Sequence, residues 1–402
     1  MFCFFFRRLN DLDQIAPLVF EYSKNNNHKD VFYICTNNDL DFESNKIAKF
    51  LLKNGVKMGY LHNFLLKQHE IIFLDIIFRL KKIFYKHLGS FFGKIINKCY
   101  QTLNNKNLYI KFLEKNQIST LIFDYPSDFN HIIKTFITLK KDLKFKIIGI
   151  EHGILSYKNF TDYKKKETQY ENCEYKDFDK IIVPNELSKK KLIYLGYDLK
   201  KISVAGCPRF TSVWNFVLRK KIFTNLNISV SQKKIKIVFM DHSSKYGVIE
   251  DNYLNLIKFI NQQNHIDFKI KPNTSNQNNS AVSSKNIPEE LISNNDSINL
   301  IDWSDIVICI NSSIIFDAIL NDKIFYYPKY FHKQEMEWDN DPCCIQFKRE
   351  IDLFDNIQNL NREILFKLKK SINKKNILER NVFLGKKDDE NFLKNYINQN
   401  LN

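Results

Sequence analysis

Short apolar runs alternate with amphipathic helical segments along most of the chain, and this alternation constrains the fold more strongly than any other sequence feature. In the first half, the apolar runs predict strands and the amphipathic segments between them predict helices. The predicted strands are Phe2–Phe6, Val31–Thr36, Leu121–Phe123, Lys146–Ile150, Ile181–Val183 and Ile202–Val204, and the helices are Asp11–Ser23, Lys46–Asn54 and residues 130–140. Continuous apolar strands separated by helices are typical of parallel sheets covered on both faces.

The pattern starts afresh in the second half. The predicted strands are Ile235–Met240, Asp267–Ile270, Ile306–Ile310 and Ile324–Tyr327, with helices at Asn252–Asn261 and Ile314–Leu320. We therefore predict an α/β protein with two Rossmann-like domains facing a cleft, at residues 1–220 and 221–375, followed by a helical tail at 376–402. Ligands of such sheets bind at the carboxyl ends of the strands, so the loops after the strands are where functional residues are expected.

The charge of the chain indicates which partners to consider. With 61 basic and 45 acidic residues among 402, the net charge is +16, and such a surplus attracts nucleic acid, anionic membranes or phosphorylated substrates. The basic residues are dispersed and no nucleic-acid-binding module is recognisable, so we expect no specific nucleic acid partner.

The apolar runs and cysteines predict a cytoplasmic location. Met1–Phe6 reads as a buried strand rather than a signal peptide, and no apolar run approaches the roughly 18–20 residues that span a bilayer. The eight cysteines are scattered without a CxxC motif, which favours reduced, structural thiols.

His152 and Gly153 follow a predicted strand directly. An imidazole titrates near neutrality, so His152 is a candidate general base, and Gly153 lets another chain approach. A surface-loop histidine is the alternative interpretation.

Three further strand ends carry residues suited to anions. Arg209 ends the turn Gly206-Cys207-Pro208 and suits a phosphate or carboxylate, or is a solvated hinge residue. Ser243 and Ser244 follow Met240 and offer either anion-binding amides or a simple helix cap. Lys271 follows Ile270, and a lone lysine is usually a solvated charge.

Asn311, Ser312 and Ser313 form the most informative strand end. They precede the helix Ile314–Leu320, which contains Asp317. Two serines at a helix N-terminus combine hydroxyl groups, free backbone amides and the positive end of the helix dipole. We expect a phosphate site here.

The first domain offers polar residues for an acceptor. Arg8, Asp11 and Asp13 occupy the first strand–helix loop, and Asp124 follows a strand at the same rim; simple helix capping is the alternative for Asp11 or Asp13. Neither a Walker A motif, GxGxxG nor HExxH occurs. DxD triplets occur at residues 11–13, 39–41, 177–179 and 339–341, but none follows a strand of the predicted donor half. We predict no cofactor and no bound metal.

Residues 73–98 form a basic amphipathic stretch. An apolar stripe from Phe73 to Ile95 lies opposite Arg79 and several lysines. Such a helix can lie on an anionic bilayer, here the inner face of the cell membrane, or pack its stripe on the sheet.

In their order along the chain, four of these motifs resemble those of GT-B-type transferases of bacterial surface polysaccharides. They are His152-Gly153, Gly206 to Arg209, Lys271-Pro272 and Ser312 to Asp317. The families concerned are the CDP-glycerol glycerophosphotransferase-like and the capsule polysaccharide transferase families. The motifs span residues 150–330, while the first part of the chain fits only by its strand–helix pattern.

The resemblance implies a metal-independent transfer of a sugar or polyol-phosphate group from a nucleotide-activated donor to a glycan or lipid-linked acceptor. It implies that Ser312 and Ser313 bind the donor phosphate, that His152 is the base, and that Asp317 orients the serine loop. Relatives often carry His-Pro where this chain has Lys271-Pro272; lysine can neutralise a phosphate but cannot replace a neutral imidazole.

Two other functions stay open at this point. A UDP-sugar 2-epimerase shares the two-domain fold and needs no acceptor. A non-catalytic basic protein that binds nucleic acid would account for the charge alone. The sequence names neither the donor, the acceptor nor the stereochemical outcome.

Overall fold

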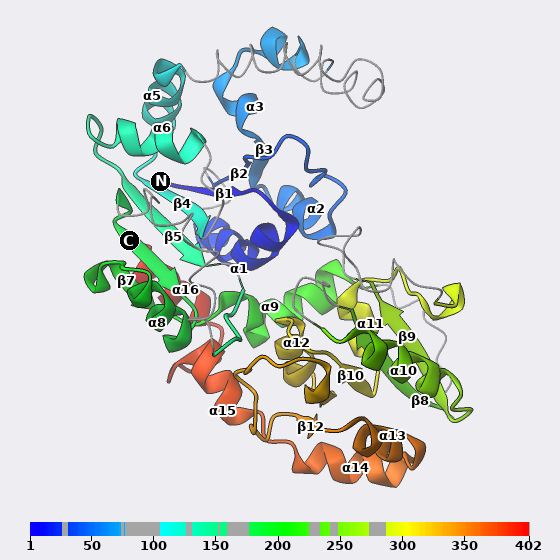
Figure 1. The fold of residues 1–402 in the computed structure, drawn as a ribbon. Helices are drawn as coiled ribbons and strands as arrows, with labels where there is room; N and C mark the ends of the chain where they lie inside the picture. Colours follow the sequence, from blue (N-terminus) through cyan, green and yellow to red (C-terminus); the bar gives the residue numbers. More distant parts are fainter. Residues whose placement is uncertain are drawn as a thin grey trace.

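The computed structural model contains two parallel sheets, each flanked by helices (Figure 1). It describes residues 1–25, 31–73, 76, 105–125, 131–151, 153–158, 177–224, 234–241, 248–272 and 287–401. All strand pairings within the two sheets are parallel, which confirms the predicted α/β class.

The first sheet has seven strands in the order β3-β2-β1-β4-β5-β6-β7. Their bounds are β1 Phe2–Phe6, β2 Phe32–Cys35, β3 Lys57–Tyr60, β4 Thr120–Tyr125, β5 Lys146–Glu151, β6 Lys180–Val183 and β7 Ile202–Val204. The helices between them are α1 Leu9–Asn25, α2 Lys46–Lys53, α3 Leu61–Leu65, α5 Lys106–Lys115, α6 His131–Leu139 and α8 Glu186–Tyr194.

The central strand β1 shows why a run of phenylalanines is needed here. Phe2, Phe4 and Phe6 pack in the core on the side of α1 and α2, whereas Cys3 and Phe5 pack in a separate core with α5 and α6. Successive side chains of a strand point to opposite faces, and helices cover both faces of this sheet. Every residue of β1 is therefore buried.

The second sheet has five strands in the order β12-β11-β10-β8-β9. Their bounds are β8 Ile235–Met240, β9 Ile266–Lys271, β10 Ile306–Ile308, β11 Ile324–Pro328 and β12 Ile345–Phe347. The helices are α10 Glu250–Asn261, α11 Ser297–Trp303, α12 Ile314–Leu320, α13 Glu350–Gln358 and α14 Arg362–Ser371.

The last part of the chain divides between the two domains. In α15 (Lys375–Leu378) and the turn η11 (Glu379–Phe383), Ile377 and Val382 belong to the core of the second domain. Helix α16 (Phe392–Asn400) returns to the first domain, where Phe392 and Tyr396 share the core of α1. Figure 1 shows α16 beside α1, away from α13 and α14. The predicted tail is thus shared between the two cores.

Two passages of the chain between the domains, an outward passage after β7 and a return passage through η11, touch each other. The outward passage runs from β7 through the turn η5 (Pro208–Phe210) into helix α9 (Ser212–Val217). Cys207 N donates to Val382 O at 3.1 Å. Gly206 has a positive φ of 86°, and a Cβ on it would lie 2.1 Å from the same carbonyl oxygen. Glycine is required here both by backbone conformation and by close approach.

Most predicted elements are confirmed, and their bounds either match or differ by one or two residues at an end. Strands β3 and β12 and helices α3, α5, α8, α9, α11 and α13 were not predicted. Strand β3 has no buried residue: Lys57 is exposed and the other three are partly buried, so no apolar run marks it in the sequence. Strand β12 has three residues and lies at the sheet edge. Both are short elements stabilised by their neighbours rather than by their own composition.

Within the described residues, we find no helix that is both long and apolar enough to cross a membrane. The six cysteines that the structure describes are free thiols and all are buried, as expected for structural residues.

We expect Gly206→Ala to destabilise the protein strongly. The non-glycine left-handed conformation alone costs about 1–3 kcal/mol, and the clash with the Val382 carbonyl adds to it. Gly196→Ala is the matched control, because Gly196 has φ of 85° but nothing within 4 Å of an added Cβ. Urea denaturation measures both; equal losses for the two variants would show that the contact between the passages is unimportant.

Candidate functional site

The parallel pairing of the second sheet brings three predicted loops to one edge. Met240 pairs with Lys271, and Phe239 pairs with both Ile270 and Ile308. Lys271 on β9 and the loop after β10 therefore flank the end of β8 from its two sides, roughly 10 Å apart given the usual strand spacing. The serine loop, as we call residues 309–313, leads into α12.

Lys271 is a half-buried cation with unused hydrogen-bonding capacity. Among the described residues, its ammonium group makes no hydrogen bond or ion pair. Burial lowers the pKa of Lys271, and the nearby Asp296 carboxylate raises it. Asp296 is itself paired with Lys46 of α2 in the first domain, at 2.5 Å. Lys271 thus lies close to a contact between the domains, where an arriving anion would find an unneutralised charge.

The serine loop is turned around a buried thiol. Burial raises the pKa of Cys309 to about 12, although the backbone amides of Ser312, Ile310 and Asn311 lower it. The Ser312 hydroxyl accepts from Ile314 N at 3.3 Å. Ser313 is the residue before the helix, and its side chain makes no capping hydrogen bond; among the described residues its hydroxyl has no partner.

The predicted acceptor-side carboxylates lie near one another in the first domain. Asp11, Asp124 and Asp13 all raise the pKa of Tyr33, after the larger effect of its burial. Asp11 Oδ2 accepts from the amides of Arg7 and Arg8, both at 2.9 Å. Asp11, in the first turn of α1, therefore closes the β1–α1 loop by accepting from preceding amides, as the third helical residue of a capping box does. The Arg8 residue itself is exposed, and Asp124 is buried at the end of β4.

Arg209 lies between two carboxylates from different domains. Its Nε donates to Asp13 Oδ2 of α1 at 2.5 Å, and its Nη1 lies 2.8 Å from Asp317 Oδ2 of α12. The side chains are largely buried, with exposed fractions of 10% for Arg209, 27% for Asp13 and 2% for Asp317. The two carboxylates raise the pKa of Arg209 despite its burial, so the guanidinium stays charged.

This Asp13–Arg209–Asp317 triad changes the interpretation of Arg209. The sequence predicts a ligand for a phosphate, and that role stays a prediction. In the structure the guanidinium is already neutralised, and it connects α1, the outward passage and α12. Because Asp317 lies in the first turn of α12, the triad also fixes the helix that follows Ser312 and Ser313.

The chain after β5 reaches the second domain. We call residues 153–158 the crossing segment. Ile154 belongs to the core of the second domain, and Tyr157 forms an antiparallel bridge with Met336. Asn311 Nδ2 donates to the Tyr157 hydroxyl. The crossing segment therefore brings Gly153, whose φ is 76°, from the strand end of the first sheet toward the serine loop.

The remaining predicted site residues fall outside the described residues. They are His152, Ser243 and Ser244. The chain on either side of His152, at Glu151 and Gly153, is described. Of the basic amphipathic stretch, only Phe73 and Ile76 at its start are described, and both are exposed.

The DxD triplets serve structural contacts. Asp339 accepts from Lys329 Nζ at 2.7 Å, Asp341 accepts from Arg380 and Asp179 accepts from Ile147 N. In the described ranges, no group of three or more His, Cys, Asp or Glu residues is placed to hold a metal ion.

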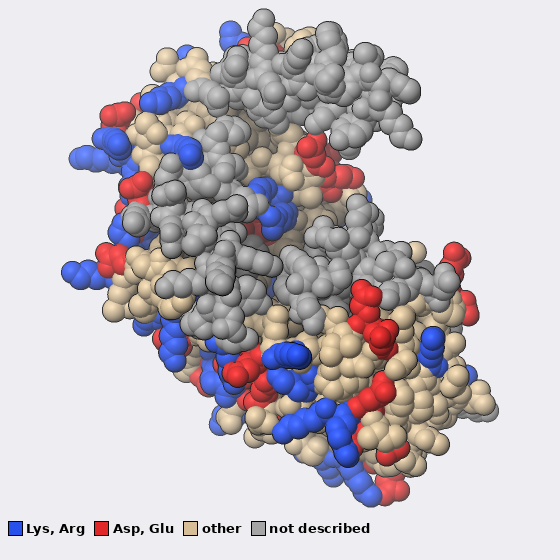
Figure 2. Space-filling model, in the orientation of Figure 1, with Lys and Arg blue, Asp and Glu red and all other residues tan. Residues whose placement is uncertain are grey.

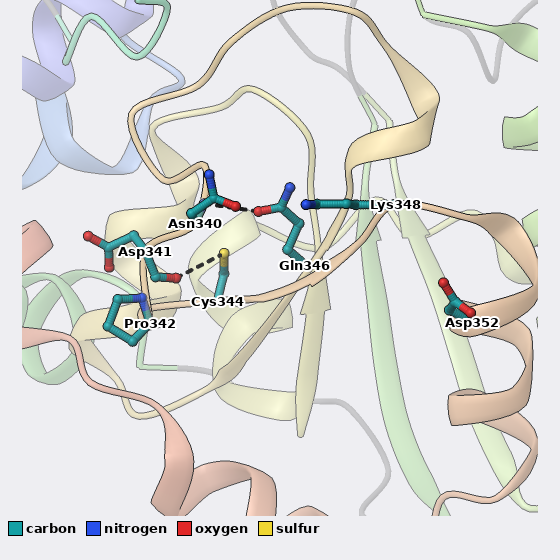
Figure 3. A pocket seen from close by; sticks show the side chains of 7 residues that line it. All are labelled: Asn340, Asp341, Pro342, Cys344, Gln346, Lys348 and Asp352. Carbon is teal, nitrogen blue, oxygen red and sulfur yellow. Dashed lines mark hydrogen bonds between the residues drawn. The ribbon is translucent and has the colours of Figure 1, made fainter.

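One cavity of about 460 Å³ lies on the second domain around β12 (Figure 3). It is lined by Asn340, Asp341, Pro342, Cys344, Gln346, Lys348 and Asp352. Asn340 N donates to Gln346 Oε1 at 3.0 Å, and the Cys344 thiol points to the Asp341 carbonyl. No predicted site residue lines this cavity, which is at the sheet edge opposite to β9.

Solved structures with the same arrangement of two domains identify the fold. The structure of MnaA from S. aureus with UDP is 12% identical and aligns over 99% of this chain and 95% of its own, with a TM-score of 0.53. A variant of the wall teichoic acid polymerase TagF soaked with CDPG is 14% identical over 99% of this chain and 87% of its own, with a TM-score of 0.55. The chain has the GT-B fold.

A third structure with this fold is the UDP-GlcNAc 2-epimerase of Neisseria meningitidis bound to UDP-GlcNAc. It is 14% identical over 92% of this chain and 93% of its own, with a TM-score of 0.53. No protein-family model matches the chain, and no curated protein matches it. The predicted resemblance to GT-B-type enzymes is confirmed at the level of the fold.

Sequence reasoning missed two residues that join the domains of this GT-B chain. Tyr157 carries no motif, and its partner Asn311 is distant in sequence. Lys46 looks like an ordinary helix-start lysine, yet it pairs with Asp296 across the domains. Covariation of the paired positions among related sequences could have identified these contacts, but a single sequence carries no such information.

Arg209→Met tests the charge balance of the triad. Removal of the cation leaves the Asp13 and Asp317 carboxylates without a counter-charge, so we expect a loss of about 3–5 kcal/mol in the free energy of unfolding. Asp13→Asn keeps one ion pair intact and should cost clearly less. Arg349→Met, which breaks an exposed pair with Asp352, should show no measurable change. If chemical denaturation shows a larger loss of unfolding free energy for Asp13→Asn than for Arg209→Met, this account is refuted.

The triad also predicts a pH dependence. Burial raises the pKa of Asp13 above its ordinary 3.8, and Arg209 only partly opposes this. The stability gained by protonating Asp13 is complete below the unfolded-state pKa and is lost as pH rises through the folded-state pKa. The wild-type free energy of unfolding, minus that of Asp13→Asn, should therefore fall as pH rises from about 3.5 toward neutrality. If this free-energy difference stays constant or grows with pH, the pKa of Asp13 is not raised in the folded protein.

Proposed function

We propose that this GT-B chain is a transferase. It moves a sugar or polyol-phosphate group from a nucleotide-activated donor to a glycan acceptor, which is lipid-linked, in surface polysaccharide biosynthesis. The observation that carries the proposal is the edge formed by Lys271 and the serine loop on either side of β8. Within the part of the chain that the structure describes, neither the Lys271 ammonium group nor the Ser313 hydroxyl has a hydrogen-bonding partner. This is the position where ligands of open parallel sheets bind.

The donor phosphates would contact Lys271, Ser312 and Ser313, with Asn311 beside them and Ser243 and Ser244 following the strand between. A half-buried ammonium stabilises the negative charge that develops on a leaving nucleotide more strongly than an exposed one, because water screens it less. Residues that bind this charge only as the bond breaks accelerate transfer.

His152 is the proposed base for the acceptor hydroxyl. Its neighbour Gly153 begins the crossing segment, which runs from the first sheet to the serine loop. A base on this loop would lie between acceptor and donor. The acceptor side would use Arg8, Asp11, Asp13 and Asp124, each of which also has a partner within the protein.

We further propose that the enzyme acts in the cytoplasm at the inner face of the membrane. Residues 73–98 supply the contact, and the exposed Phe73 and Ile76 at their start fit an apolar side that meets lipid. On the face drawn in Figure 2, lysines and arginines are spread among acidic residues over both domains.

The first experiment is a thermal-shift screen with CDP-, UDP- and GDP-linked donors and with CMP. A ligand at 100 times its dissociation constant adds about 2.7 kcal/mol to stability. A UDP-sugar 2-epimerase is the competing function, because a solved epimerase shares the fold. To test this, UDP-GlcNAc is incubated with the protein in the absence of any acceptor and monitored by NMR. Conversion to its 2-epimer would establish epimerisation and refute the transferase proposal.

Lys271→Ala should weaken donor binding by roughly 10- to 100-fold, because a charged hydrogen bond contributes about 1.5–3 kcal/mol. Lys269→Ala is the matched control: Lys269 lies two residues earlier on the same strand, and its ammonium group donates to Glu290 O at 3.0 Å. Calorimetric titration of the identified donor gives both affinities. Equal affinities in the two variants would remove Lys271 from the phosphate site.

His152→Ala should lower kcat by a factor on the order of 10²–10⁴, the usual contribution of a general base. The donor dissociation constant should stay unchanged, since the base acts on the acceptor. Steady-state rates with the identified donor and acceptor measure the effect; full activity of the variant would exclude His152 as the base.

A further inference from the structure

The crossing segment is held on the second domain by its backbone. Ser156 O accepts from Glu337 N at 2.7 Å, and Lys158 N donates to Glu335 O at 2.9 Å. Together with the Tyr157–Met336 bridge, these bonds make a short antiparallel pairing. They leave the position of the Tyr157 Cα defined without any help from its side chain.

The first domain holds the same segment from the other side. Asn185, which caps α8, donates through Nδ2 to Leu155 O at 3.3 Å and to Asn381 Oδ1 at 2.6 Å. Asn381 belongs to the return passage in η11 and is fully buried. The crossing segment is therefore fixed against both domains before the Tyr157 side chain is considered.

The Tyr157 side chain connects the crossing segment to the serine loop. Its hydroxyl accepts a hydrogen bond from Asn311 Nδ2, and Asn311 directly precedes Ser312. An asparagine amide has two donors and one acceptor group, and the bond to Tyr157 sets which edge of the amide remains for a ligand. It also fixes the backbone of Asn311 relative to Gly153.

We infer that Tyr157 is a positioning residue. By binding Asn311, it holds the serine loop at a fixed place relative to the crossing segment, which begins at Gly153. The inference rests on the proposed function and deepens it: the donor site of the second domain is completed by a residue of the first half of the chain. The sequence motif around Ser312 gives no indication that the donor site depends on Tyr157.

Tyr157→Phe tests the inference, because it removes only the hydroxyl group and leaves the backbone pairing intact. We expect roughly tenfold weaker binding of the donor nucleotide, the effect of one partly buried hydrogen bond. The urea midpoint should stay unchanged. Tyr109→Phe is the control, since the buried Tyr109 hydroxyl makes no hydrogen bond within the described residues. An unchanged dissociation constant in Tyr157→Phe overturns the inference.

A double-mutant cycle shows whether Tyr157 acts through Asn311. If it does, Tyr157→Phe combined with Asn311→Ala binds the nucleotide no more weakly than Asn311→Ala alone. Losses that add up fully would mean that Tyr157 works independently of Asn311, which contradicts the inference.

Hydrogen exchange separates this inference from the proposed function. In the absence of any ligand, the amides of residues 310–316 should exchange faster in Tyr157→Phe than in the wild type, with no change in Tyr109→Phe. If no nucleotide binds the wild-type protein, the proposed function fails, and the exchange rates still decide the positioning role. Unchanged exchange in Tyr157→Phe refutes it.

Discussion

A buried arginine between two carboxylates decides how the two domains of this chain are placed. Removing such charges from water is costly, and their mutual attraction repays the cost only in well-matched geometry. Arg209 reaches Asp13 and Asp317 together only when α1 and α12 approach the outward passage at one distance. Apolar contacts between domains tolerate sliding, whereas this ion triad does not. The relative placement of the two sheets is thus specified by charge more sharply than by packing.

The triad and the crossing segment act on the same loop from its two ends. Asp317 fixes the first turn of α12, after the serines, and Tyr157 binds Asn311, before them. The serine loop is therefore held in part by residues that precede the second sheet in the chain: Tyr157 through Asn311, and Arg209 through Asp317. Lys271 contrasts with Arg209. Two carboxylates form ion pairs with Arg209, whereas Lys271 forms no ion pair with any described residue, although the Asp296 carboxylate is near enough to raise its pKa. On the face drawn in Figure 2, lysines and arginines lie among acidic residues over both domains.

Sequence reasoning predicted what depends on local pattern and missed what depends on contact. Buried strands such as Phe2–Phe6 and Ile235–Met240 were evident, because a strand covered on both faces must be apolar throughout. Topology then implied that the ends of β8, β9 and β10 would meet. The partners of Arg209 could not be inferred, since Asp13 and Asp317 are 304 residues apart and either carboxylate has other plausible roles. The role of Tyr157 could not be predicted for the same reason: it depends on the contact with Asn311, and no sequence spacing relates the two residues.

The position of α16 has a consequence for how the protein is made. The strands of the first sheet are synthesised before any of the second domain, yet Phe392 and Tyr396 of α16 fill part of the core over α1. While the ribosome extends the second domain, the apolar side of α1 that α16 will cover faces water. Domains usually fold as units in order of synthesis, but here the first domain is completed last. The nascent chain must therefore keep an unfinished apolar surface from aggregating until α16 is synthesised.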